Sequence, residues 1–319
     1  MKHKLFNGHF FLLLVGLSLI FFLCYKLGFE NIYDSFQKVG FKFSIILIVA
    51  FLWHLCNTYA WSFLLGRKPS LWTLFKIKLK AETYNMITPF FSSGGEPLRI
   101  FYLKNFYSLK ENISSVYLDK TLHIYSGIIF VGLGTFAASF YFKNPFHIRL
   151  LLIPISFVFI SLSFFIFKNR GKVFFFINKL NSFLKIKWLE MYQEKFVELD
   201  SISSNFLQKR KKDFCISLFF HLLGWILGVF EIYLLLHFLG EPISFLAAFA
   251  LGAFMIVVHT FSSFIPGSLG ASEGSLFLLF TYVGFSPFLA VSFPLLRRLR
   301  MLCFTFIGVL IPVNPHSGS

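Results

Sequence analysis

Two stretches of the chain place proline, glycine and glutamate inside otherwise apolar sequence. Residues 85–99 read NMITPFFSSGGEPLR, and residues 259–273 read HTFSSFIPGSLGASE. Irregular backbone is tolerated in a membrane only where protein or a water-filled cavity satisfies its polar groups, and paired interrupted segments are typical of a binding site. We therefore expect a site where the two stretches meet; the alternative is two loops whose spacing agrees by chance. In each stretch a proline stands seven positions before a glutamate: Pro89 before Glu96, and Pro266 before Glu273.

Charged side chains are few inside the apolar segments, and each is a candidate for chemistry because a charge within a bilayer is costly unless paired or functional. Glu96 and Arg99 would share one face of a helix that begins near Gly95. Backbone N–H groups at that helix start, beside Gly94 and Gly95, could receive an anionic headgroup. Alternatively, Glu96 and Glu273 merely cap their own helices. The candidate charges are Glu96, Arg99, Glu231, Glu273, Arg297, Arg298 and Arg300.

The composition is far more apolar than a soluble domain can hide. Of 319 residues, 56% are hydrophobic and only 14% are charged, and 49 are phenylalanine. This indicates a polytopic membrane protein that forms one transmembrane domain over residues 1–319. The formal net charge of +16 does not indicate nucleic-acid binding, because the basic residues fall between apolar runs and not along one soluble face.

A spanning helix needs roughly 20 apolar residues to cross the hydrocarbon core. Residues 83–95 comprise only thirteen uncharged positions, which favours a re-entrant hairpin or a broken helix. We predict an all-α integral membrane bundle of about 6–8 spanning helices, with broken elements at 85–99 and 259–273 that could form an inverted repeat. The other long apolar segments are 5–25 (taken as an uncleaved first helix), 43–66, 121–142, 150–167, 214–240, 242–272 and its continuation 274–296.

The sequence allows two interpretations of where the late arginines lie. Residues 301–313 would reach only about 20 Å as a helix. Arg297, Arg298 and Arg300 therefore lie within the last membrane helix, where at least one faces the interior, or they all extend to a headgroup layer.

The distribution of lysine and arginine predicts the orientation. Basic residues gather in the connections 67–80, 99–110 and 168–213, and these share one side if the element at 85–99 enters and leaves by the same face. The positive-inside rule then places both termini in the cytoplasm, with the chain in the plasma membrane. The connection 168–213 repeats apolar residues at helical spacing, which predicts an amphipathic cytoplasmic helix or helix pair.

No enzymatic motif or metal-ligand spacing is present, so we expect neither a catalytic residue nor a cofactor. Asp119 and Lys120 precede the apolar segment 121–142 and form either a surface ion pair or part of the same polar path. We expect the histidines of the membrane segments to be packed or hydrogen-bonded and not metal ligands: His54, His123, His221, His237 and His259.

In the two interrupted stretches, 85–99 and 259–273, and at the late arginines, the sequence resembles the transmembrane flippase-like family shared by lysylphosphatidylglycerol synthases and stand-alone membrane proteins. The resemblance covers essentially the whole chain. The chain departs from the family pattern at Asp119, Lys120 and His123, which puts an ion-pair role there in doubt. We expect no soluble aminoacyl-transfer domain. The matching residues are Asn85, Pro89, Gly95, Glu96 and Arg99, then Pro266, Gly267, Gly270 and Glu273, and a late arginine, Arg297 or Arg298.

The resemblance implies a protein that moves an anionic or headgroup-modified lipid between leaflets. Arg99 and a late arginine would hold the phosphate, and Glu96 and Glu273 would pair with them or with a cationic headgroup. Membrane lipids are then the partners, and a homo-oligomer or a partner enzyme stays open. The alternatives are a lipid-linked glycosyl- or aminoacyl-transferase, or a subunit of one, and a membrane scaffold that does not transport.

Overall fold

The structure is a computed structural model, and it describes residues 29–66, 69–87, 94–141, 146–168, 193–262 and 270–313, with isolated positions between 18–25 and 178–190. All regular elements in these ranges are helical. Four helices are long and apolar enough to cross a membrane, and 152–166 forms a shorter apolar helix. The prediction of an all-α polytopic membrane protein is therefore confirmed. The predicted helix at 5–25 lies almost wholly outside the described residues.

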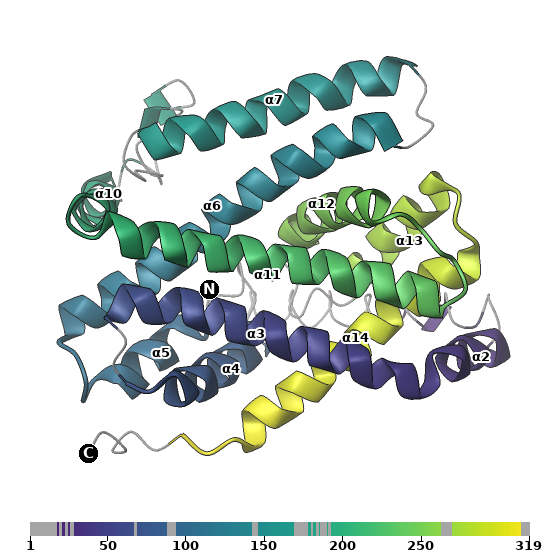
Figure 1. The fold of residues 1–319 in the computed structure, drawn as a ribbon, viewed down its shortest axis with the longest axis horizontal. Helices are drawn as coiled ribbons and strands as arrows, with labels where there is room; N and C mark the ends of the chain where they lie inside the picture. Colours follow the sequence, from purple (N-terminus) through teal and green to yellow (C-terminus); the bar gives the residue numbers. More distant parts are fainter. Residues whose placement is uncertain are drawn as a thin grey trace.

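The described chain forms two units of similar order, each made of a long helix, a pair of helices and a second long helix (Figure 1). The first unit comprises α3 (Phe43–Leu65), α4 (Leu71–Ile87), α5 (Glu96–Leu103) and α6 (Leu109–Tyr141). The second unit comprises α11 (Lys211–Phe238), α12 (Phe245–Ser262), α13 (Ala271–Val283) and α14 (Pro287–Leu310). The remaining elements are α2 (Phe29–Val39) with the 3-10 turn η1 (Gly40–Lys42), α7 (Phe146–Lys168) and α10 (Gln193–Lys209).

The two units are inverted relative to each other. Helices α3 and α11 lie side by side along the molecule (Figure 1). Their directions are opposite, because Arg210 at the start of α11 donates to the Phe63 carbonyl near the end of α3, at 2.9 Å. At the other end, Lys42 lies over the ring of Phe238. In addition, α6 packs on α12 while α14 packs on α4, so the second long helix of each unit contacts the pair of the other unit.

Helices α4 and α5 form a hairpin that opens at the end of α3. Helix α4 begins shortly after α3 ends, and the Tyr107 hydroxyl, which follows α5, donates to the Leu65 carbonyl at 2.7 Å. The chain therefore enters and leaves at the same end. This hairpin geometry agrees with the re-entrant form, one of the two forms predicted for the first broken element.

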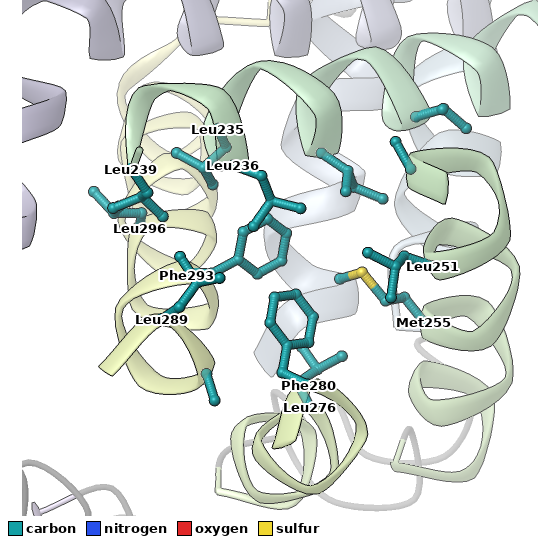
Figure 2. Close-up of a cluster of buried hydrophobic side chains, with 14 of the residues drawn as sticks. Leu235, Leu236, Leu239, Leu251, Met255, Leu276, Phe280, Leu289, Phe293 and Leu296 are labelled. Carbon is teal, nitrogen blue, oxygen red and sulfur yellow. The ribbon is translucent and has the colours of Figure 1, made fainter. Parts of the chain in front are cut away.

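The hairpin of α12 and α13 opens at the opposite end. Leu239, which follows α11, belongs to one buried cluster with Leu276 and Phe280 of α13 and Leu289 of α14 (Figure 2). A second buried cluster lies where the first hairpin opens and includes Leu65 of α3 and Leu103 of α5. The two hairpins thus project into the bundle from opposite ends (Figure 1).

The apolar segment 274–296 is divided between two helices, α13 and α14. Helix α13 ends at Gly284, whose φ of 98° is accessible to glycine and strained for other residues. Helix α14 then begins at Pro287, and the Ser286 hydroxyl accepts from the backbone N–H of Leu289 at 3.3 Å. Pro at the first helical position after a serine cap is a strong start signal, and it separates the two helices.

A correction concerns the basic connection at 67–80. Lys76, Lys78 and Lys80 lie on α4 and not in a loop, and the Lys78 side chain is buried. These lysines stand among apolar residues, and lysine is itself a good helix former, so the segment can form a helix. Within the predicted amphipathic connection 168–213, the structure describes α10, whose Leu207 is buried in the cluster at the end of α3.

Candidate functional site

Two of the predicted site residues, Asn85 and Gly95, hold the first hairpin together. The Asn85 side-chain oxygen accepts from the backbone N–H of Gly95 at 2.6 Å, and it thereby closes the hairpin between α4 and α5. A Cβ on residue 95 would overlap the Ala81 carbonyl oxygen, so only glycine fits. Asn85 and Gly95 therefore position the start of α5. Gly94 lies directly before it, while Pro89 lies outside the described residues.

Arg99 on α5 reaches a buried carboxylate. Its guanidinium donates to Asp119 Oδ2 at 2.7 Å and lies over the Trp61 ring, 3.9 Å from the centroid. Lys78 Nζ donates to the same oxygen at 3.0 Å and to the Asn57 carbonyl at 2.7 Å. His221 on α11 places Nε2 3.2 Å from Asp119 Oδ1.

We call these five residues, namely Asn57, Lys78, Arg99, Asp119 and His221, the first charge cluster; all are buried. Four of them were not among the predicted site residues. Lys78 was assigned to a loop, His221 was expected to be packed or hydrogen-bonded, and the role of Asp119 was left in doubt. That doubt is corrected, because Asp119 joins helices α4, α5, α6 and α11. Burying Lys78 and Arg99 requires such a partner.

Glu96 and Arg99 diverge to neighbouring partners on α6. Glu96 Oε1 accepts from Lys120 Nζ at 2.7 Å, and both side chains are partly exposed. The pair lies at the edge of the first charge cluster. Asp119 and Lys120 therefore belong to the same polar path, which was one of the two readings of the sequence.

The second charge cluster consists of Glu231, Glu273, Arg297, Arg298 and Arg300. Glu231 on α11 bridges two arginines of α14, with Arg297 Nε at 3.2 Å and an Arg300 nitrogen at 3.1 Å. Glu273 Oε1 accepts from Arg298 Nε at 2.8 Å. All three late arginines thus pair inside the bundle, so the reading in which they all extend to a headgroup layer is wrong.

Glu273 also caps its own helix. Its Oε2 accepts from the backbone N–H of Gly270 at 2.8 Å, at the start of α13. Gly270 has a φ of 75°, which favours glycine at this turn. Glu273 therefore caps its own helix and also pairs with Arg298, and the cap orients the carboxylate toward Arg298. Pro266 and Gly267 lie outside the described residues.

The two clusters lie at different depths. His221 and Glu231 are ten positions apart on α11, which is about 15 Å along the helix axis. The second cluster has three arginines against two glutamates, and the Nε of Arg300 is buried without a hydrogen-bond partner. One positive charge is therefore left over there. Around the first cluster, Glu82 one turn from Lys78 on α4 adds a further carboxylate.

Among the described residues, no group of three or more His, Cys, Asp or Glu side chains could hold a metal ion. The carboxylates of both clusters instead face guanidinium and ammonium groups. The arrangement suits binding of an anion or exchange of ion-pair partners.

Comparison with known proteins decides the family. Residues 10–308 match the family described as lysylphosphatidylglycerol synthase TM region. The chain belongs to this family.

Relatives in the family include a UPF0104 membrane protein of Methanothermobacter thermautotrophicus, 24% identical over all of this chain and 97% of that protein. A UPF0104 membrane protein of Pyrococcus horikoshii is 23% identical over 91% of this chain and 92% of its own length. No solved structure matches the chain. The family resemblance read from 85–99 and 259–273 is thus confirmed.

Proposed function

We propose that this protein moves an anionic or headgroup-modified lipid between the two leaflets of the plasma membrane. The observation that carries the proposal is the pair of helical hairpins, opening at opposite ends, that each bring a glutamate to an ion pair. Glu96 pairs with Lys120 and Glu273 pairs with Arg298. Inverted units with interrupted helices at a central polar site are the usual architecture for alternating access.

Ion pairs that can exchange partners would let a headgroup pass. The second charge cluster has three guanidinium groups against two carboxylates, so an entering lipid phosphate meets an excess of positive charge there. Arginine binds phosphate through two parallel hydrogen bonds, which a carboxylate also accepts. A phosphate can therefore replace Glu273 on Arg298, and the reverse exchange releases the lipid.

The basic residues give the orientation under this proposal. Arg210, Lys211 and Lys212 stand at the start of α11, at the end where the first hairpin opens. Because lysine and arginine concentrate on the cytoplasmic side, the first hairpin opens to the cytoplasm and the second to the outer face. Both termini are then cytoplasmic.

Leaflet exchange in proteoliposomes tests the proposal. Purified protein is reconstituted with fluorescent phospholipids or polyprenyl-phosphate lipids, and a membrane-impermeant quencher reports how fast labelled lipid changes leaflet. We expect protein-dependent exchange of an anionic lipid. In Arg298→Gln the exchange rate should fall at least about tenfold, which corresponds to an activation free energy higher by roughly 1.4 kcal/mol.

The matched control is Arg210→Gln, at a half-exposed arginine outside both clusters. Exchange in the control should stay close to that of the unmodified protein. The absence of exchange for every lipid in folded, inserted protein would overturn the proposal. Product formation that depends on a divalent metal would instead favour a lipid-linked transferase.

A further inference from the structure

The amide of Asn57 determines which nitrogen of His221 carries a proton. Asn57 Nδ2 donates to the Trp53 carbonyl at 2.9 Å, and a carbonyl can only accept. The amide oxygen therefore faces His221, where Oδ1 lies 3.0 Å from Nδ1. Since this oxygen also only accepts, Nδ1 of His221 must be the protonated nitrogen.

The other ring nitrogen then faces a carboxylate. In neutral His221, Nε2 holds a lone pair 3.2 Å from Asp119 Oδ1, and two acceptors at this distance repel. Nε2 is buried and has no hydrogen-bond partner among the described residues in this arrangement. A proton between Nε2 and Oδ1 would turn the repulsive contact into a charge-assisted hydrogen bond. The geometry thus leaves room for one more proton.

The groups around His221 come from four helices. Asn57 on α3 is uncharged, Lys78 on α4 and Arg99 on α5 are cations, and α6 supplies Asp119 and His123. The His123 ring lies edge-on to the His221 ring, with centroids 5.3 Å apart. With His221 neutral, the cations Lys78 and Arg99 are balanced by the carboxylates of Asp119 and of Glu82, one turn from Lys78 on α4. A further proton would leave one positive charge.

An arriving anion changes this balance. A phosphate that draws Arg99 away from Asp119 adds negative charge and removes one of the two cations that face the carboxylate. In an apolar interior both changes favour the extra proton, because unbalanced charge is costly there. Binding of the anion and binding of the proton then strengthen each other, and the coupling is reciprocal.

We infer that His221 and Asp119 form a proton-binding site that takes up one proton when an anionic lipid headgroup enters the bundle. The inference rests on the proposed function and adds an energy source to it. A proton gradient across the membrane would then bias the direction of lipid movement.

Two variants separate the proton site from general packing. His221→Asn keeps an N–H donor near Nδ1, which can still reach Asn57, and removes Nε2. The matched control is His237→Asn, because His237 is an exposed histidine on the same helix. Thermal unfolding in detergent establishes that both variants are folded.

The experiment has two readouts, each with a phosphatidylglycerol probe. In weakly buffered detergent solution, a pH dye reports proton uptake when short-chain phosphatidylglycerol is added. In liposomes, exchange of fluorescent phosphatidylglycerol is followed from about pH 5 to pH 8, where histidine titrates. We expect uptake of about one proton and an exchange rate that changes by up to tenfold per pH unit, the limit for one linked proton.

In His221→Asn, proton uptake should disappear and the pH profile should flatten, whatever the absolute rate. His237→Asn should match the unmodified protein in both readouts. Exchange or binding without proton uptake in the unmodified protein would overturn the inference and leave the proposed function standing. Uptake that persists in His221→Asn would overturn the assignment to His221. No binding and no exchange would remove the proposed function and the inference together.

Discussion

Asp119 and Glu231 each hold two cations, but their surroundings differ. The side chains of Lys78 and Arg99 around Asp119 are 8% and 7% exposed, whereas those of Arg297 and Arg300 around Glu231 are 27% and 16% exposed. Lys78 also donates to the α3 backbone, and Arg99 stacks on Trp61. The first cluster is therefore tied into the helix packing, while the second consists of more accessible guanidinium groups.

The comparison teaches that similar ion pairs can serve different purposes. A deeply buried and multiply bonded carboxylate is costly to disturb and suits a positioning or proton-binding role. Accessible arginines with one excess charge can exchange partners with an incoming phosphate at lower cost. We therefore assign the main headgroup-binding site to the second cluster and proton binding to the first, where the headgroup reaches Arg99 during its passage. The predictions below test that division.

The largest expected effect follows from Asp119→Asn. The change leaves Lys78 and Arg99 buried without a charged partner, and the free energy of unfolding should fall by about 3–5 kcal/mol. Thermal and denaturant unfolding in detergent measure this. In Asp213→Asn, which breaks the partly exposed pair with Arg210, the loss should be below about 1 kcal/mol. Equal losses in the two variants would contradict the buried role of Asp119.

Glu231→Gln should be less damaging to stability. The glutamine oxygen can still accept one hydrogen bond, and Arg297 and Arg300 keep some access to solvent. We expect a loss of about 1.5–3 kcal/mol, the range for hydrogen bonds to charged groups. If Glu231→Gln costs more stability than Asp119→Asn, the contrast between a packed cluster and an accessible one does not hold.

A third effect concerns the crossings between the two units. In Gly308→Ala the new Cβ would overlap Thr83 of α4, and in Gly134→Ala it would overlap Ala253 of α12. Close helix contacts of this kind are common at small residues in membranes, and overpacking costs about 1–3 kcal/mol.

Gly228→Ala provides the matched control, because a Cβ at that helical position meets no atom within 4 Å. Alanine is the better helix former, so stability should stay unchanged or rise by up to about 1 kcal/mol. The three alanine variants are compared by thermal unfolding under one set of conditions. A loss in Gly228→Ala as large as at the crossings would argue against the close contacts.

The smallest effect on stability is expected for Glu96→Gln. The carboxylate of Glu96 and the ammonium of Lys120 are 19% and 34% exposed, so the loss should be below about 1 kcal/mol. Its effect on lipid exchange should be smaller than that of Arg298→Gln, since the first hairpin contributes less to headgroup binding in this division. A greater loss of exchange in Glu96→Gln would transfer the headgroup site to the first hairpin.

The class of the protein and the position of its irregular elements could be predicted from the sequence. Apolar composition required a membrane bundle, because so much phenylalanine cannot be hidden in a soluble domain. The short uncharged segment between Glu82 and Glu96 predicted a hairpin, because thirteen residues cannot cross a bilayer. The type of residue alone made Glu96, Glu273 and the late arginines candidates, since charges there must be paired.

Which charged side chains meet depends on the packing of the helices and could not be predicted from the sequence. Lys78 and Asp119 are 41 positions apart, and Asp119 and His221 are 102 apart, so local periodicity cannot show that their side chains converge. A lysine beside other lysines is typical of a solvated connection, and Lys78 turns inward because α3 and α6 supply a carbonyl and a carboxylate. The partner of each charge depends on how inverted helices pack across the bundle, and that packing is a property of the whole chain.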